Sequence, residues 1–175
     1  MIIENKYRSR ACGEVSEGDI GQVIRVAGWV ENIRDHGGIL FIDLRDQYGV
    51  VQVVIPNDSL LEGVRKETVV TIEGEVTRRD PETVNPKLAT GTVEVRARTL
   101  EILGKVTEAL PFEIGSSTDT KEEIRLKYRF LDLRNKKVKD KIILRSQVIS
   151  FLRSEMERLG FTEIQTPILT ATSPE

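Results

Sequence analysis

The sequence predicts a small all-β barrel followed by a hinge and a long helix, and three observations support this prediction. Residues 22–103 contain five short runs in which apolar and polar residues alternate, as in strands that bury one face. A short helical pattern separates the third run from the fourth. An apolar pattern of helical period then occupies residues 136–159.

Turn residues separate the predicted strands. Gly37-Gly38 joins the first strand to the second, and residues 46–49, with the sequence DQYG, form a compact turn before the third. Asn57-Asp58-Ser59 has the composition of a helix cap. Three strands, a helix and two strands is the order of an OB-fold barrel, which we favour over another small β-barrel. The strands are predicted at residues 22–33, 39–46, 50–55, 68–79 and 91–103.

The segment after the barrel, residues 104–120, contains Pro111 and Gly115 and has little periodicity, so it is predicted to be a linker. A short helix ending at Lys127 is expected next, with Asp119 or Thr120 as its N-cap. Residues 121–141 carry nine Lys or Arg against four Asp or Glu. This charge fits either contact with nucleic-acid phosphates or an ordinary solvated helix face.

The long helix is expected to begin near Lys136 and to end before Gly160, a typical C-terminal cap. Residues 161–164 are then predicted to form a strand, which Pro167 interrupts. The resulting domain prediction is a barrel at residues 1–104, a hinge at 105–134 and the start of a second domain at 135–175.

Composition limits the classes of function. The 26 basic and 28 acidic residues give a net charge of −2, which argues against nucleic-acid binding through bulk positive charge. The single cysteine, Cys12, excludes an intramolecular disulfide, and the start MIIENKYRSR lacks an apolar signal core. No run approaches the roughly 18 apolar residues of a membrane helix. We expect a cytoplasmic protein without a membrane partner.

Strand parity places three side chains of suitable chemistry on the outer face of the barrel. Phe41, Gln52 and Glu94 all point away from the apolar sides of their strands. An exposed ring can stack on a base, while Gln and Glu can hydrogen-bond to base edges. The alternative is that Phe41 packs under a loop and the two polar residues are merely solvated.

The end of the first strand adds further candidates. Arg34 could contact a phosphate or a base edge, and His36 lies in a polar turn. Trp29 is interpreted as a large core residue rather than a base contact. One histidine and one cysteine provide no recognisable metal-ligand set, so no metal site is predicted.

Four strings occur in the order found in bacterial-type aspartyl-tRNA synthetases: GWVENIRDHGGILFIDLRDQYGVVQVV, LATGTVEV, RLKYRFLDLR and GFTEIQTPILTATSPE. The chain resembles this family over nearly its whole length. The resemblance implies an anticodon-binding OB domain, a hinge, and the first helix and strand of a truncated α+β class II catalytic domain. It places the family's anticodon-reading aromatic, glutamine and glutamate on Phe41, Gln52 and Glu94.

The resemblance also implies roles for the loops near these residues. Arg34 and His36 match positions near the last anticodon bases, and Arg79 and Thr83 lie in another loop of that surface. Family members with histidine at the His36 position tend to charge both tRNA-Asp and tRNA-Asn. Thr83, at the second position linked to this choice, does not decide the matter.

The last string resembles motif 1 of class II synthetases, the helix and strand that build the homodimer interface and end at Pro167. Glu175 matches the glutamate that contacts the aspartate substrate. For the complete enzyme the resemblance implies ATP, magnesium and an aspartyl-adenylate intermediate. No catalytic residue is expected within these 175 residues, so the chain alone should be inactive.

Two alternatives remain open. Lysyl- and asparaginyl-tRNA synthetases share the OB domain and motif 1, although RFLDLR and FIDLRDQYGVVQVV favour the aspartyl family. The chain could also be a non-catalytic OB-fold module that binds tRNA or another single-stranded nucleic acid.

Overall fold

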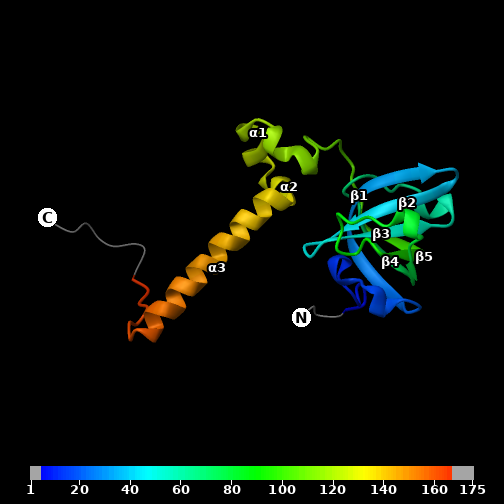
Figure 1. Ribbon diagram of the computed structural model, residues 1–175. Helices are drawn as coiled ribbons and strands as arrows, with labels where there is room; N and C mark the ends of the chain where they lie inside the picture. The colour runs from blue at the N-terminus through cyan, green and yellow to red at the C-terminus, as the bar shows by residue number, and fades with distance from the viewer. Residues whose placement is uncertain (1–4, 167–175) are drawn as a thin grey trace. The chain divides into compact units, whose positions relative to one another are not determined.

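The computed structural model describes residues 5–166, and the chain divides into two compact units, Met1–Ala109 and Leu110–Glu175. The first unit is a closed five-stranded barrel in which β1 pairs with both β2 and β4 (Figure 1). The predicted OB-type arrangement of five strands is confirmed. The strands are β1 Val23–His36, β2 Ile39–Arg45, β3 Val50–Ile55, β4 Val69–Arg78 and β5 Val93–Gly104.

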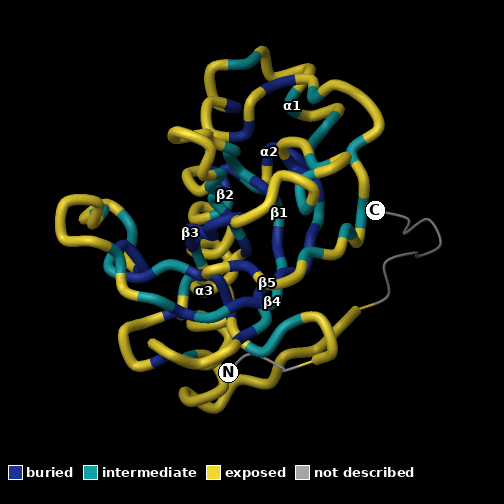
Figure 2. The backbone as a smooth tube through the Cα atoms, turned by 90° about the vertical axis from the view of Figure 1, so that its right-hand side faces the viewer, coloured by how far each residue is buried: buried dark blue, intermediate teal, exposed yellow. Residues whose placement is uncertain are grey.

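The barrel core follows from the alternation of each strand. Figure 2 shows buried stretches along the barrel strands. Residues predicted to face inward are buried, among them Ile42 on β2, Val53 on β3 and Val95 on β5, each with no exposed surface. Each such side chain stabilises the fold by about 1.5–3 kcal/mol relative to exposure. Because side chains alternate between the two faces of a strand, the residues between these inward-facing ones point to the outer face of the barrel.

The predicted helix between β3 and β4 is a single 3-10 turn, Asp58–Leu61, which Asn57 caps by accepting a hydrogen bond from the Ser59 N–H at 3.1 Å. Gly37 and Gly38 make the β1–β2 turn with φ values of 64° and 88°. Such backbone angles are strained for residues with a Cβ, so the glycine pair determines this turn.

A β-bulge on β1 determines which side chains of this strand point outward from the barrel. The pairing with β2 shifts between Val30 and Asn32, so Glu31 is the extra residue. Beyond the bulge, Ile33 lies opposite Ile42 and packs on the core. Asn32 and the two following even-numbered residues therefore point outward, whereas an unbroken strand would have turned them inward.

Glu67 fixes this bulge from the side. Its N–H donates to the Val30 carbonyl at 2.7 Å, and the Val30 N–H donates to the Thr68 carbonyl at 3.0 Å. Glu67 has a φ of 64°, the left-handed conformation that costs a residue with a Cβ about 1–2 kcal/mol. Its carboxylate pairs with Arg45, whose Nε lies 3.5 Å from the Glu31 carboxylate.

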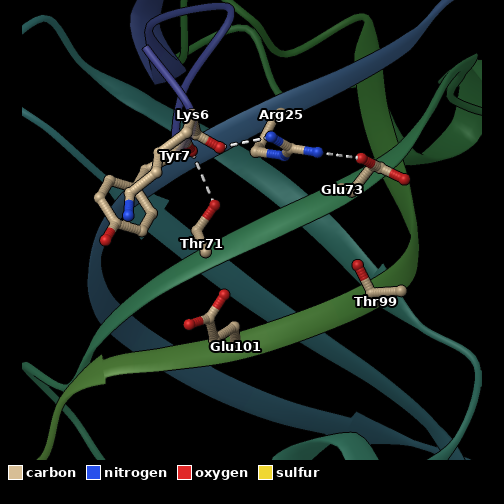
Figure 3. A pocket seen from close by; sticks show the side chains of 7 residues that line it. All are labelled: Lys6, Tyr7, Arg25, Thr71, Glu73, Thr99 and Glu101. Carbon is tan, nitrogen blue, oxygen red and sulfur yellow. Dashed lines mark hydrogen bonds and ion pairs between the residues drawn. The ribbon is translucent and has the colours of Figure 1, made fainter.

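Residues that precede β1 lie across the outer face of β1 and β4 (Figure 3). The Ser9 N–H donates to the Arg25 carbonyl at 2.8 Å, and the Thr71 hydroxyl donates to the Tyr7 carbonyl at 2.7 Å. Beside them is a polar hollow of about 320 Å³, in which Arg25 pairs with Glu73 at 2.6 Å. Hydrogen bonds of Tyr7 and Ser9 therefore attach this part of the chain to the barrel.

The second unit contains α1 Glu122–Lys127, α2 Arg129–Asp132 and α3 Lys136–Arg158. The predicted caps of the first helix are wrong: Lys121 occupies the N-cap position and no side chain caps it. The predicted linker before this helix includes a 3-10 helix, Ile114–Asp119, and its Phe112 and Ile114 side chains pack on Leu131 of α2.

The buried carboxylate of Asp132 organises this unit. It accepts hydrogen bonds from the Ser117 hydroxyl at 2.8 Å, from Arg125 at 3.1 and 3.2 Å, and from Arg129 at 2.6 Å. Asn135, the N-cap of α3, donates from Nδ2 to the Ile114 carbonyl at 2.8 Å. Polar side chains thus join α1, α2, the 3-10 helix and the start of α3.

The end of α3 agrees with the sequence, but the following strand does not form. Gly160 has a φ of 88°, and the Phe161 N–H donates back to the Met156 carbonyl at 3.0 Å, as in a helix C-cap. The strand prediction for residues 161–164 is wrong, because no described residue offers its backbone a pairing partner. Pro167 and Glu175 lie outside the described residues.

Much of α3 carries exposed apolar side chains; only Val138 of its apolar residues is buried. The exposed set includes Leu144, Phe151, Leu152 and Met156. Even so, within residues 5–166 no helix has the length and apolar character that crossing a membrane requires.

Candidate nucleic-acid interface

A groove of about 590 Å³ lies on the outer face of the barrel unit. It brings together every anticodon-contact residue that was predicted within residues 5–166: Arg34, His36, Phe41, Gln52, Arg79, Thr83 and Glu94. Six further residues line the groove that were not predicted as contact residues from the sequence: Ile39, Val54, Thr77, Arg78, Asp80 and Arg96.

Neighbouring strands place the central side chains side by side. Arg34 on β1 pairs with Phe41 on β2, and Phe41 pairs with Val54 on β3. Gln52 on β3 and Glu94 on β5 lie next to each other across the parallel β3–β5 contact. Because all of them occupy outward positions, the barrel itself builds the floor of the groove.

A chain of hydrogen bonds crosses this floor. Arg34 Nη2 donates to Asp43 Oδ1 at 2.5 Å and to Gln52 Oε1 at 3.3 Å. Gln52 Nε2 in turn donates to Glu94 Oε2 at 2.8 Å. Gln52 is consequently only 6% exposed although it points outward. The alternative in which Gln52 is a solvated strand residue does not hold for this arrangement.

The aromatic part of the groove is a pair of rings. The His36 and Phe41 rings meet edge to face, with centroids 5.9 Å apart and planes at 69°. This geometry leaves His36 exposed beside a half-buried Phe41. The pair therefore presents both an apolar surface and imidazole nitrogens to a planar ligand.

Cations and a short turn form the other wall. Arg78 pairs with Glu17 at 3.0 Å, whereas the Nε of Arg79 is buried and has no hydrogen-bond partner among the described residues. Thr83 ends a 3-10 turn in which its hydroxyl donates to the Asp80 carbonyl at 3.0 Å. This wall offers positive charge to an anionic ligand.

Sequence parity could have revealed some of the omitted residues. Arg96 occupies the same outward phase of β5 as Glu94, and Ile39 the same phase of β2 as Phe41. Conversely, the interpretation of Trp29 as a core residue is wrong. It lies on the outer face of β1 opposite Arg45, whose guanidinium is 5.5 Å from the indole centroid, and it does not line the groove.

Comparison with known families agrees with this geometry. Residues 24–103 match the OB-fold nucleic acid binding domain, and residues 121–175 match the class II tRNA synthetases of the D, K and N type. The chain thus joins an OB-fold binding domain to the class II tRNA synthetase fold.

Relatives and solved structures narrow the class. The chain is 53% identical to the aspartate–tRNA(Asp/Asn) ligase of Paracoccus denitrificans over 173 residues, which cover 97% of this chain and 29% of the relative. It is 51% identical to the ligase of the same name from Pelagibacter ubique, over 98% of this chain and 29% of that relative. The chain therefore spans less than a third of the length of these relatives.

Among solved structures, asparaginyl-tRNA synthetase from Pyrococcus horikoshii in complex with asparaginyl-adenylate has a TM-score of 0.76 and 26% identity, covering 95% of this chain and 37% of that one. An aspartyl-tRNA synthetase from Leishmania major, described as putative, has a TM-score of 0.82 at 20% identity, over 94% and 36% of the two chains, and supports the fold alone.

The chain is a class II tRNA synthetase sequence with an OB-fold binding domain. Within that class, relatives at 53% and 51% identity to this chain are named aspartate–tRNA(Asp/Asn) ligases.

Proposed function

We propose that this chain supplies the anticodon-reading part of an aspartate–tRNA ligase. The observation that carries the proposal is the grouping of Phe41, Gln52 and Glu94 on one outer face, in a groove with a cationic wall. The pair formed by the exposed His36 ring and the half-buried Phe41 ring can stack a base, the amide and carboxylate can read base edges, and the arginines can hold phosphates. The net negative charge of the chain makes this local arrangement, rather than bulk attraction, the source of binding.

The ligase is proposed to charge tRNA-Asn as well as tRNA-Asp. Two observations support this choice: His36 lies in the groove against Phe41, and the similar proteins are named aspartate–tRNA(Asp/Asn) ligases. The two anticodons, GUC and GUU, differ only in their third base. A site that serves both must tolerate either pyrimidine there.

The proposed reaction of the whole ligase has two steps. The aspartate carboxylate attacks the α-phosphate of ATP and displaces pyrophosphate, and a hydroxyl of the terminal ribose of the tRNA then takes the aspartyl group from the adenylate and displaces AMP. Membership of the class II synthetases implies the use of ATP. Magnesium would stabilise the phosphate charges, but within residues 5–166 no group of His, Cys, Asp or Glu is arranged to hold a metal ion. The chain's own contribution is to bind and orient tRNA, and we propose that it is inactive alone.

Homodimerisation of the ligase in the cytoplasm completes the proposal. Its support is the set of exposed apolar side chains on α3, among them Phe151 and Leu152; this helix directly precedes the string that resembles motif 1. Pro167 at the interface and Glu175 at the aspartate site keep the roles that the family resemblance gives them.

The binding proposal is tested with RNA hairpins that carry the GUC or GUU anticodon and with one of unrelated loop sequence. The Phe41→Ala variant is expected to bind the cognate hairpins about 5- to 150-fold more weakly, because base stacking contributes about 1–3 kcal/mol. Tyr48→Ala is the matched control, since Tyr48 is an exposed aromatic residue of the β2–β3 turn that does not line the groove. Equal affinities of the wild type and the Phe41→Ala variant would refute the stacking role.

Aminoacylation separates the ligase from a non-catalytic binding module. A ligase that contains this chain should transfer labelled aspartate to tRNA-Asp and tRNA-Asn transcripts, while the 175-residue chain should transfer none. Transfer to tRNA-Asp alone would refute the dual specificity. No transfer to either transcript would favour the binding module.

A further inference from the structure

Asp43 does not line the groove itself, but it neighbours two residues that do, Arg34 and Gln52. It pairs across the sheet with Gln52 on β3 and with Asn32 on β1, and its side chain is only 14% exposed. Both carboxylate oxygens are occupied: Oδ1 accepts from Arg34 at 2.5 Å and Oδ2 from Asn32 Nδ2 at 3.2 Å. Asp43 is therefore shielded from a ligand, while the side chain that it holds, Arg34, is 43% exposed.

Arg34, held by Asp43, also restricts the orientation of the Gln52 amide. The same Arg34 nitrogen donates to Gln52 Oε1 at 3.3 Å, and Gln52 Nε2 donates to Glu94 at 2.8 Å. An amide discriminates between bases by presenting either its NH₂ donor or its oxygen acceptor. A cation at the oxygen and a carboxylate at the nitrogen leave the amide one favourable orientation.

We propose that Asp43 is a positioning residue that holds Arg34 and, through it, sets the donor–acceptor order of Gln52, so that it determines which bases the groove accepts. This inference rests on the proposed anticodon-reading function. Asp43 also neutralises Arg34. A freed guanidinium would pair with any RNA phosphate, a contact that carries no sequence information.

The test uses Asp43→Asn, which keeps the shape of the side chain and removes its charge. Dissociation constants are measured for the GUC hairpin and for hairpins in which each anticodon base is changed in turn. The ratio of mismatched to cognate constants is expected to fall about tenfold at one or more positions, the magnitude of one hydrogen bond to a charged group. Binding of the mismatched hairpins should become tighter and more dependent on salt, because the released Arg34 neutralises a phosphate.

Glu73→Gln is the matched control. It makes the same change in net charge by removing a carboxylate that pairs with Arg25 at 2.6 Å on another part of the outer face (Figure 3). Its selectivity should equal that of the wild type. The Arg34→Ala background isolates the pathway: Asp43→Asn should have no further effect on selectivity there, whereas a purely structural effect of Asp43 would persist.

The two proposals fail in different ways. If Phe41→Ala weakens binding but Asp43→Asn leaves selectivity unchanged, the positioning role is wrong and anticodon reading stands. If Asp43→Asn changes selectivity equally with and without Arg34, the role does not act through Arg34 and is also wrong. Thermal melting shows whether the Asp43→Asn variant is folded. If it is unfolded, the Arg34→Ala variant alone provides the test, because Arg34 is exposed. Loss of Arg34 should abolish the selectivity that depends on Gln52. If Phe41→Ala leaves binding unchanged, the proposed function itself fails.

Discussion

The side chains of the groove divide into those that other residues hold and those that remain open to a ligand. Gln52 is held between Arg34 and Glu94, and Arg34 is held by Asp43. His36 is exposed and is supported only from one side, by the edge-to-face contact with Phe41. The structure therefore combines a preorganised polar floor with a ring that is supported on one side only. This combination suits the proposed site, which would read the first two anticodon bases strictly and accept either of two pyrimidines at the third position.

His36→Leu is predicted to narrow specificity. Leucine keeps an apolar contact with Phe41 but has no nitrogen to hydrogen-bond a base. Binding of the GUU hairpin should weaken about tenfold, the magnitude of one lost hydrogen bond, while binding of the GUC hairpin should change little. Titration of both hairpins against the variant measures the ratio. An equal change for both hairpins would argue against a discriminating role for His36.

The sequence alone predicted the outward direction of the central groove residues, because strand parity is a local property. Phe41, Gln52 and Glu94 lie in strands whose inward residues are apolar, so their direction needed no further information. Arg34 and His36 could not be placed in this way, since the bulge at Glu31 inverts the parity of β1. The hydrogen bonds of Asp43 depend on cross-strand register, which alternation along one strand does not reveal.

Among the secondary-structure elements, β1 shows how a local irregularity serves the site. Its bulge is held by backbone bonds between Val30 and the Glu67-Thr68 pair, and by Arg45 between two carboxylates. Burial, the largest influence, raises the pKa of Glu31 in this cluster despite the opposing charge of Arg45. The bulge is therefore built into the barrel and does not depend on a ligand.

The left-handed backbone of Glu67 leads to a comparison of two variants. Glu67→Ala and Glu67→Gly both remove the carboxylate that pairs with Arg45, but only alanine retains a Cβ at a φ of 64°. Glu67→Ala should therefore be less stable than Glu67→Gly by about 1 kcal/mol. Chemical denaturation of the two variants measures the difference. A more stable alanine variant would mean that this backbone conformation is not strained.

The elements after the barrel were predicted less well. The helix at residues 136–158 has a strong period and a glycine stop, so its bounds could be predicted closely. The 3-10 helix at Ile114–Asp119 has no such period, because it forms around the contacts of Phe112 and Ile114 with Leu131. Residues 161–164 have strand composition, but strands form through pairing and not through composition.

Asp132 makes the helical unit sensitive to acid. Burial alone would raise the pKa of its carboxyl, but hydrogen bonds from Arg125 and Ser117 and the charges of Arg125 and Arg129 outweigh burial and hold the pKa below its ordinary value. A lowered folded-state pKa gives stability that is present above the unfolded-state pKa of about 3.9 and is lost as pH falls through the folded-state value. Helix content should accordingly decrease below about pH 4.

Asp132→Asn should lower the stability of this unit by about 2–3 kcal/mol at neutral pH, because two arginines lose the charge of their buried partner. It should also remove part of the acid transition. Asp140→Asn is the control, since Asp140 forms only an exposed pair with Lys136 at 2.5 Å. Circular dichroism during acid titration and denaturation distinguishes the two variants. Equal stability of both would contradict the organising role of Asp132.

For the whole molecule, charge and apolar surface are distributed differently between the two units. The barrel span, residues 22–103, has ten basic and thirteen acidic residues, while residues 121–141 have nine and four. Exposed apolar side chains are frequent along α3. The proposed nucleic-acid binding by the barrel would therefore depend on local geometry, and the proposed association through the helical unit would depend on apolar burial.

We predict from this distribution that the chain self-associates through α3. Leu144 and Phe151 are 59% and 63% exposed, so contact with a second copy would remove large apolar areas from water. Sedimentation should show a mass that rises with concentration, and Leu144→Lys with Phe151→Lys should shift the chain toward the monomer. Hairpin binding by the barrel should be unaffected. A wild-type chain that is monomeric at all concentrations would contradict this use of α3.

The short parallel contact between β3 and β5 has a mechanical consequence for the barrel. These strands pair only at Val53–Val95 and Val54–Arg96, whereas the antiparallel pairs extend along most of their strands. The hydrogen bond from Gln52 to Glu94 joins the two strands one residue before these backbone pairs. An RNA base that contacts both side chains would link β3 to β5 where the pairing between strands is shortest. Binding of such a base would therefore stabilise the closed barrel, and the closed barrel would in turn favour binding of the base.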